Sequence, residues 1–314
     1  MKRNTDGQTA GVRPAGRGFR LWRDLRREAP NYVMMAPYLL FFVTFTLLPV
    51  IMSVVLGFTN FNMLQPPEFV GWDNFLRMFL DDSVFLTALK NTLIFACVTG
   101  PVGYVLCFMF AWLINEMPRI PRAVMTTVFY APALSGQAYT VFQLFFGADR
   151  YGIFNGWLLS LGLLKEPVSW LQDTRTIMTV LIVTQLWLSL GSGFLAFIAG
   201  FQGVDPSLFD ACAIDGVRNR FQELWYVTLP SMKSQMLFSA VMQIVSAFTV
   251  ADISVQLVGF PSTEYAGETL VTHIMDYGST RYEMGYACAL AAFVFALMLV
   301  MNKLVTLVIR RVGH

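Results

Sequence analysis

Residues 207–230 read Ser-Leu-Phe-Asp-Ala-Cys-Ala-Ile-Asp-Gly-Val-Arg-Asn-Arg-Phe-Gln-Glu-Leu-Trp-Tyr-Val-Thr-Leu-Pro and separate two long apolar stretches. Asp205 followed by Pro206 suits the start of a helix, with the aspartate as N-cap and the proline in the first turn. Gly216 can adopt a positive φ, the usual way in which a helix ends and the chain turns. The stretch therefore predicts two short helices on either side of Gly216, and Pro230 ends the second.

Outside this stretch the chain is strongly apolar. It is 56% hydrophobic and 13% charged, whereas soluble domains carry about 25% charged residues. About 20 apolar residues cross the hydrocarbon core of a bilayer as a helix. Six stretches reach that length: about 33–57, 88–114, 123–146, 176–201, 233–258 and 285–309. The composition predicts an all-α polytopic membrane protein with six transmembrane helices.

The basic residues indicate how these helices are oriented. With six spans, 16 of the 22 Lys and Arg residues lie on the side of the N-terminus and 6 on the other side. Positive charge is retained in the cytoplasm, so both termini and the loop of about 202–232 are expected to be cytoplasmic. Residues 1–30 form a basic cytoplasmic tail, in which 19–29 are either a lipid-surface helix or a solvated segment, and 31–314 form the membrane domain.

The four cysteines and two histidines do not suggest a disulfide framework or a metal site. Cys97, Cys107 and Cys288 fall within apolar stretches, and Cys212 lies in the polar loop, where small apolar packing is the expected role. The P-loop pattern is absent as well, because Gly152 is followed by Ile153 where a lysine would be required. Any ATP hydrolysis must come from a partner.

The polar loop closely resembles the "EAA" loop of the permease subunits of binding-protein-dependent ABC importers. The matching positions are Asp210, Ala211, Cys212, Asp215, Gly216, Phe221, Leu229 and Pro230. Gly71-Trp72-Asp73-Asn74-Phe75, Lys90-Asn91-Thr92, Tyr151-Gly152-Ile153-Phe154-Asn155 and Gly285-Tyr286-Ala287 are similar to the sugar-importing permeases of the maltose and glycerol-phosphate type. The resemblance covers about residues 33–310.

This resemblance implies a type I ABC importer in the bacterial cytoplasmic (inner) membrane. Its partners would be two ATPase subunits, which bind ATP and Mg²⁺, a second homologous permease and an extracytoplasmic solute-binding protein. The chain itself would be no enzyme, would bind no cofactor directly, would contact the lipid bilayer and a carbohydrate, and would bind no nucleic acid. The residues expected to couple to the ATPase are Phe209, Asp210, Ala211, Cys212, Asp215, Gly216, Phe221 and Pro230, with Phe209 as an apolar anchor.

Three departures from the family pattern stand out. Asp210 replaces the family glutamate, and Cys212 replaces the second alanine. Residues 257–262, Leu-Val-Gly-Phe-Pro-Ser, replace a glycine-rich turn of many sugar permeases, so the solute is not assigned by the resemblance.

Polar residues within the apolar stretches are candidates for a solute path. Asp252 is a carboxylate inside a predicted span, where ionisable groups usually face a bundle interior or an aqueous cavity. At 100° per residue, Gln243 shares a helical face with Ser246, and Thr249 shares another with Asp252. The predicted path comprises Gln185, Ser189, Gln243, Ser246, Thr249 and Asp252. The alternative role for each is hydrogen bonding between helices.

Three rival functions follow from the same sequence. An ABC permease for another solute, such as amino acids or polyamines, would share the loop. An ion-driven secondary transporter should carry inverted repeats and several intramembrane charges, which are missing apart from Asp252. A membrane-embedded enzyme would need a catalytic cluster, and the sequence offers none.

Overall fold

The computed structural model describes residues 28–135 and 138–312, so the predicted basic tail lies almost wholly outside the described residues. The described chain is built from helices, with an isolated antiparallel bridge between Thr59 and Phe69. It forms two compact units, Met1–Met52 and Ser53–His314. The boundary between these units falls inside the first predicted span, and the predicted division at residue 30 stays a prediction.

The first unit is dominated by one long apolar helical stretch. It runs through α2 (Ala29–Phe42), the π-helical turn η1 (Val43–Leu47) and α3 (Leu48–Leu56). Pro30 lies in the first turn, where the missing N–H costs no hydrogen bond. All its residues from 29 to 52 are exposed within the chain, as expected of a helix that is apolar on every side and surrounded by lipid.

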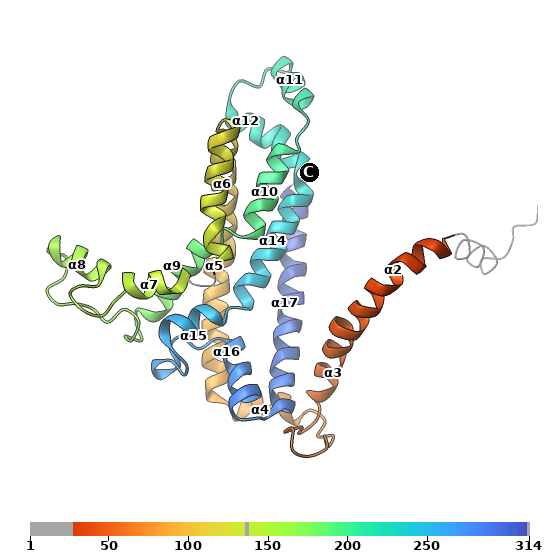
Figure 1. Cartoon of the computed structure of the whole chain (residues 1–314), viewed down its shortest axis with the longest axis vertical. Helices are drawn as coiled ribbons and strands as arrows, with labels where there is room; N and C mark the ends of the chain where they lie inside the picture. The colour runs from red at the N-terminus through yellow and green to blue at the C-terminus, as the bar shows by residue number, and fades with distance from the viewer. Residues whose placement is uncertain (1–27, 136–137, 313–314) are drawn as a thin grey trace, which may run out of the picture. The chain divides into compact units, whose positions relative to one another are not determined.

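The second unit contains the remaining elements. On the side opposite the 207–230 loop lie α4 (Asp73–Leu80), α16 (Leu270–Met275) and η4 (Asp276–Thr280) (Figure 1). The long elements are α5 (Ser83–Asn115), α6 (Arg119–Leu134), α9 (Ile177–Leu188), α10 (Ser192–Gln202), α14 (Lys233–Phe248) and α17 (Met284–Val312). Shorter elements are α7 (Ala138–Phe145), α8 (Ile153–Ser160), α15 (Asp252–Val258) and η3 (Thr263–Tyr265).

Helix α5 is the centre of this unit. It packs against α10 and α14, and α14 packs in turn against α17 (Figure 1). Small residues permit the close approach, since a Cβ added to Gly193 of α10 would come within 2.8 Å of the Ser239 hydroxyl of α14. The aromatic and aliphatic core between α5 and α10 includes Phe194 and Phe197, both fully buried.

The described residues contain four helical stretches long and apolar enough to cross a membrane, or five if one bent pair counts as a single span. The four are Ala29–Leu56, Ser83–Asn115, Ile177–Gln202 and Met284–Ile309. The third predicted span, 123–146, consists instead of α6 and α7 with undescribed residues 136–137 between them. The all-α membrane fold class is confirmed, whereas the count of six transmembrane helices stays a prediction.

The fifth predicted span was expected to be continuous, and that expectation is wrong. Helix α14 ends at Phe248, α15 begins at Asp252, and their axes differ by 43°. The linking residues leave helical geometry at Ala251, with φ −134° and ψ −48°. The Val250 carbonyl accepts a hydrogen bond from the Thr269 hydroxyl at 2.7 Å, so the break is stabilised by a neighbouring segment.

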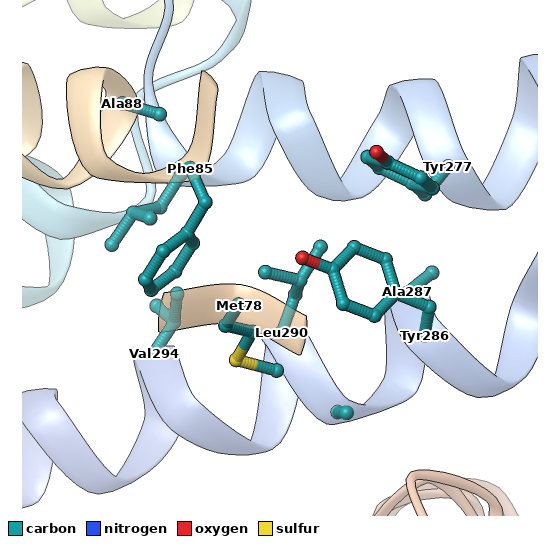
Figure 2. Close-up of a cluster of buried hydrophobic side chains, with 10 residues drawn as sticks. Met78, Phe85, Ala88, Tyr277, Tyr286, Ala287, Leu290 and Val294 are labelled. Carbon is teal, nitrogen blue, oxygen red and sulfur yellow. The ribbon is translucent and has the colours of Figure 1, made fainter. Parts of the chain in front are cut away.

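A buried cluster joins the helix ends opposite the 205–231 loop. Met78 of α4 and Phe85 of α5 lie against Leu290 and Tyr286 of α17, with Tyr277 of η4 above them (Figure 2). A backbone hydrogen bond from the Gly285 amide to the Phe61 carbonyl, 2.7 Å long, fastens the segment after α3 to α17.

Candidate functional site

The 205–231 loop forms a compact helical unit at the end of α10. Helix α11 spans Pro206–Ile214, and the Asp205 carboxylate accepts a hydrogen bond from the Ser207 amide at 2.9 Å. That backbone bond, together with one from the Ser207 hydroxyl, lowers the pKa of Asp205. Gly216 has φ +91°, as the predicted turn requires. The second half consists of α12 (Arg220–Glu223), η2 (Leu224–Thr228) and α13 (Leu229–Ser231).

One side of α11 faces the loop's own small core. Cys212 is buried with Val204 and Val227, and Phe209 packs against this group. Phe209, expected to anchor a partner, is therefore held within the chain. Its predicted role toward a partner stays a prediction.

The opposite side of the loop is open to solvent. Asp210, Ala211 and Asp215 are exposed, and Ile214 is 87% exposed. Isolated apolar side chains on a surface are ordinary, but an exposed isoleucine at the end of a short helix is a suitable contact point for another protein. Pro230 is also exposed.

The second half of the loop lies against the end of α5. The ring of Phe221 meets Trp112 edge-on, with 5.3 Å between ring centroids. The Arg220 guanidinium lies 2.8 Å from a Glu223 carboxylate oxygen and 3.7 Å from Glu116 at the end of α5. Leu224 is buried among residues of α5 and α10.

A cavity of about 230 Å³ remains between α5, α10 and the loop. Its walls include Trp112, Asn115, Glu116, Phe201, Phe209, Arg220, Glu223, Leu224 and Thr228. Among the described residues, the buried Asn115 side-chain oxygen finds no hydrogen-bond donor. The contact between the loop and α5 is thus polar and incompletely filled.

The predicted path residues divide into a buried and an exposed group. Gln185, Ser189 and Gln243 are each 6% exposed. The Gln243 amide donates to the Ser189 carbonyl at 3.1 Å and lies 3.0 Å from the Cys107 sulfur. These contacts join α14 to α5 and to the end of α9, so this group holds helices together in the described chain.

The other three path residues lie on open surfaces near the helix break. Ser246 is exposed and accepts a hydrogen bond from the Gln185 amide at 2.8 Å. Thr249 and Asp252 are also exposed, one in the break and the other at the start of α15. Because α14 does not continue through Thr249, the helical face predicted for Thr249 and Asp252 does not exist.

A buried cluster that the sequence analysis missed lies at the opposite end of the bundle from the loop. The Asp82 carboxylate N-caps α5 by accepting the Phe85 amide at 2.9 Å. Its second oxygen lies 2.9 Å from His273 Nε2 and accepts the Tyr286 hydroxyl at 2.8 Å. These partners lie about 190 and 204 positions away, so no local sequence signal could pair them.

The electrostatics of this cluster favour the ionised carboxylate. Burial alone raises the pKa of Asp82, but the hydrogen bonds from His273, the Phe85 amide and Tyr286 outweigh burial. The pKa of Asp82 therefore lies well below its usual value. A buried glutamate on the same side, Glu268, has its pKa raised by burial.

Comparison with known proteins places the chain among transport proteins, although no family model matches it. It is 30% identical over 295 residues to the probable ABC transporter permease protein YesP of Bacillus subtilis, covering 91% of each chain. It is 30% identical to the arabinooligosaccharides transport system permease protein AraP of the same bacterium, covering 90% of this chain and 89% of that one. The lactose transport system permease protein LacF of Rhizobium radiobacter is 28% identical over 228 residues, covering 72% of this chain and 74% of LacF.

The fold is also found in solved structures. A bacterial ABC transporter involved in the import of the acidic polysaccharide alginate contains a chain that superposes with a TM-score of 0.73 at 24% identity. That match covers 94% of this chain and all of the other. A bacterial alginate ABC transporter in complex with an alginate pentasaccharide-bound periplasmic protein gives a TM-score of 0.75 at 23% identity, covering 94% of this chain and 98% of the other.

Proposed function

The chain belongs to the permeases of sugar-transporting ABC systems, and from that premise we propose that it lines the membrane path for an oligosaccharide in an ATP-driven importer. The observation that supports the proposal most is similarity along almost the whole chain to a permease named for arabinooligosaccharide transport. The chain is a multi-pass membrane protein and a transport subunit rather than an enzyme.

The proposed assembly contains this chain, a second homologous permease, two ATPase subunits and an external solute-binding protein. ATP and Mg²⁺ are held by the ATPase subunits. The complex sits in the bacterial cytoplasmic membrane, with the 205–231 loop and both termini in the cytoplasm, because basic residues concentrate on that side.

The exposed side of α11 is the proposed contact for an ATPase subunit. The loop is covalently continuous with α10 and α14, so closure of the ATPase pair moves both helices. Solute delivered from outside then shifts the equilibrium between outward-open and inward-open states in proportion to its differential affinity for them.

Ser246, Thr249 and Asp252 are the proposed solute contacts, since they are exposed beside a helix break. Gln185, Ser189 and Gln243 have a holding role in this proposal. Alanine at each of the exposed three positions should raise KM for uptake in a fully assembled transporter. Unchanged kinetics at all three, with normal assembly, would remove them from the path.

The coupling role is tested by Gly216→Val in the transporter reconstituted with its partners. A β-branched residue at φ +91° costs about 1–2 kcal/mol and turns α11 away from its place. We expect uptake to fall while the complex still assembles, and stimulation of ATPase activity by the loaded binding protein to be lost. Gly216→Asn should be milder, because asparagine tolerates positive φ better than valine.

Gly162→Val is the matched control. Gly162 also has positive φ, +70°, with no atom near its added Cβ, but it lies in the external segment after α8. Its variant should leave the stimulated ATPase activity intact. Equal loss in both variants would mean that backbone strain anywhere impairs the transporter, and the coupling role would lose its support.

A further inference from the structure

The contact between the 205–231 loop and α5 supports a further inference, which rests on the proposed coupling role. We propose that the cytoplasmic end of α5 is a third point of transmission, reached through Arg220 and Phe221 of the loop and through Glu116 and Trp112 of α5. Covalent connection accounts only for movement of α10 and α14. The contact between the loop and α5 would also transmit movement to α5, the helix at the centre of the bundle.

A series of side-chain contacts crosses the loop from α11 to α5. Phe209 and Cys212 of α11 pack on Val227 of η2, so a force on α11 reaches the second half of the loop. Phe221 then meets Trp112 edge-on, and Arg220 bridges Glu223 and Glu116. The exposed helix is thereby connected to α5 without passing through either flanking span.

Space remains beside this contact, so the loop has room to shift against α5. A static interface between helices is normally filled to the density of an organic crystal. Here a cavity of about 230 Å³ persists, and the Asn115 oxygen in its wall has no donor among the described residues. Arg220 borders the same cavity and carries five N–H donors, so a shift of the loop that brings the two side chains together would give Asn115 a donor.

The position of α5 suits it to carry movement across the bundle. Helix α5 contacts α10 and α14 along its length, and its other end carries the Asp82 cluster on the external side. Movement imposed near residue 116 therefore acts on a helix that extends to the opposite side of the bundle. Arg220 and Glu116 are positioning residues in this scheme, since neither touches solute or nucleotide.

The test is a charge exchange in the complete transporter, reconstituted with ATPase subunits, second permease and binding protein. Glu116→Arg and Arg220→Glu should each lower the amount of sugar imported per ATP hydrolysed by about fivefold, the size expected when a weak attraction becomes a repulsion. The double exchange E116R/R220E should restore part of the lost ratio, because it re-forms the pair with position 116 but leaves a carboxylate at 220 facing Glu223. A purely structural contact would change assembly or expression but not this ratio.

Arg218→Glu is the matched control. It makes the same charge change in the same loop, but Arg218 forms no ion pair among the described residues and only its backbone amide bonds Gln222. A similar loss in R218E and R220E, or no rescue in the double exchange, overturns the inference. If a reversed variant fails to assemble, Glu116→Gln and Arg220→Lys are measured instead, and an unchanged ratio in both also overturns it.

The Gly216→Val variant separates this inference from the coupling role itself. If G216V uncouples transport while the exchanges at 116 and 220 have no effect, the loop couples to the ATPase but not through α5. If G216V and the exchanges at 116 and 220 all leave transport unchanged, the coupling role of the loop is contradicted as well.

Discussion

At the scale of single residues, Asp82 joins three parts of the chain through one side chain. It caps α5, pairs with His273 of α16 and accepts the hydroxyl of Tyr286 in α17. A buried carboxylate is stable only with such partners, because an unpaired charge loses its hydration without compensation. The cluster therefore fixes the helix ends opposite the 205–231 loop relative to one another.

Asp82→Asn should lower the free energy of unfolding by about 1.5–3 kcal/mol at neutral pH, the usual contribution of hydrogen bonds to a charged group. The pKa of Asp82 is depressed in the folded chain, so its contribution is present above the unfolded pKa of about 4 and is lost as pH falls below it. Thermal unfolding of the detergent-solubilised protein should show a wild-type advantage at pH 7 that shrinks toward pH 3. A difference independent of pH would contradict the ionised state.

At the scale of elements, the approach of α10 to α14 depends on glycines that carry no side chain, and Gly193 is one of them. Gly193→Ala would place a Cβ 2.8 Å from the Ser239 hydroxyl and 3.5 Å from its carbonyl. We expect a loss of about 1–3 kcal/mol, typical of overpacking, measured as a lower thermal unfolding midpoint. Ser239→Gly should recover part of it in the double variant.

Gly100→Ala in α5 is the comparison for that substitution. It also lies inside a helix, but no atom comes within 4 Å of its added Cβ. Its unfolding midpoint should stay the same or rise slightly, since alanine favours helix over glycine. Equal losses at Gly100 and Gly193 would show that packing between α10 and α14 is not the cause.

At the scale of the whole molecule, the open question is whether 119–145 crosses the membrane. If it does, residues before α6 and residues after α8 lie on opposite sides. Met117→Cys and Gly162→Cys test this with a membrane-impermeant maleimide on intact cells. We expect Gly162→Cys to label and Met117→Cys to label only after the membrane is opened, and labelling of both from outside would contradict six spans.

Much of the architecture could be predicted from the sequence because it depends on local patterns. Apolar length gave the spans around α5 and α17, and Asp205-Pro206 with Gly216 gave the two-part loop. The break after Phe248 could not be predicted, because it is stabilised by Thr269, which lies 19 positions after Val250 and donates to its carbonyl. The burial of Gln243 against Cys107 likewise depends on which helices meet, and periodicity within one helix does not contain that information.

The Asp82 cluster also has a consequence for how this chain is made. Residues 82 and 273 are 191 positions apart, and ribosomes add about 5–20 residues per second. For about 10–40 seconds after its synthesis, the α5 end therefore carries a carboxylate whose histidine and tyrosine partners do not yet exist. The nascent chain must keep that end hydrated until the last helix inserts, so protein truncated before His273 should be a substrate for membrane proteases even though its earlier helices are complete.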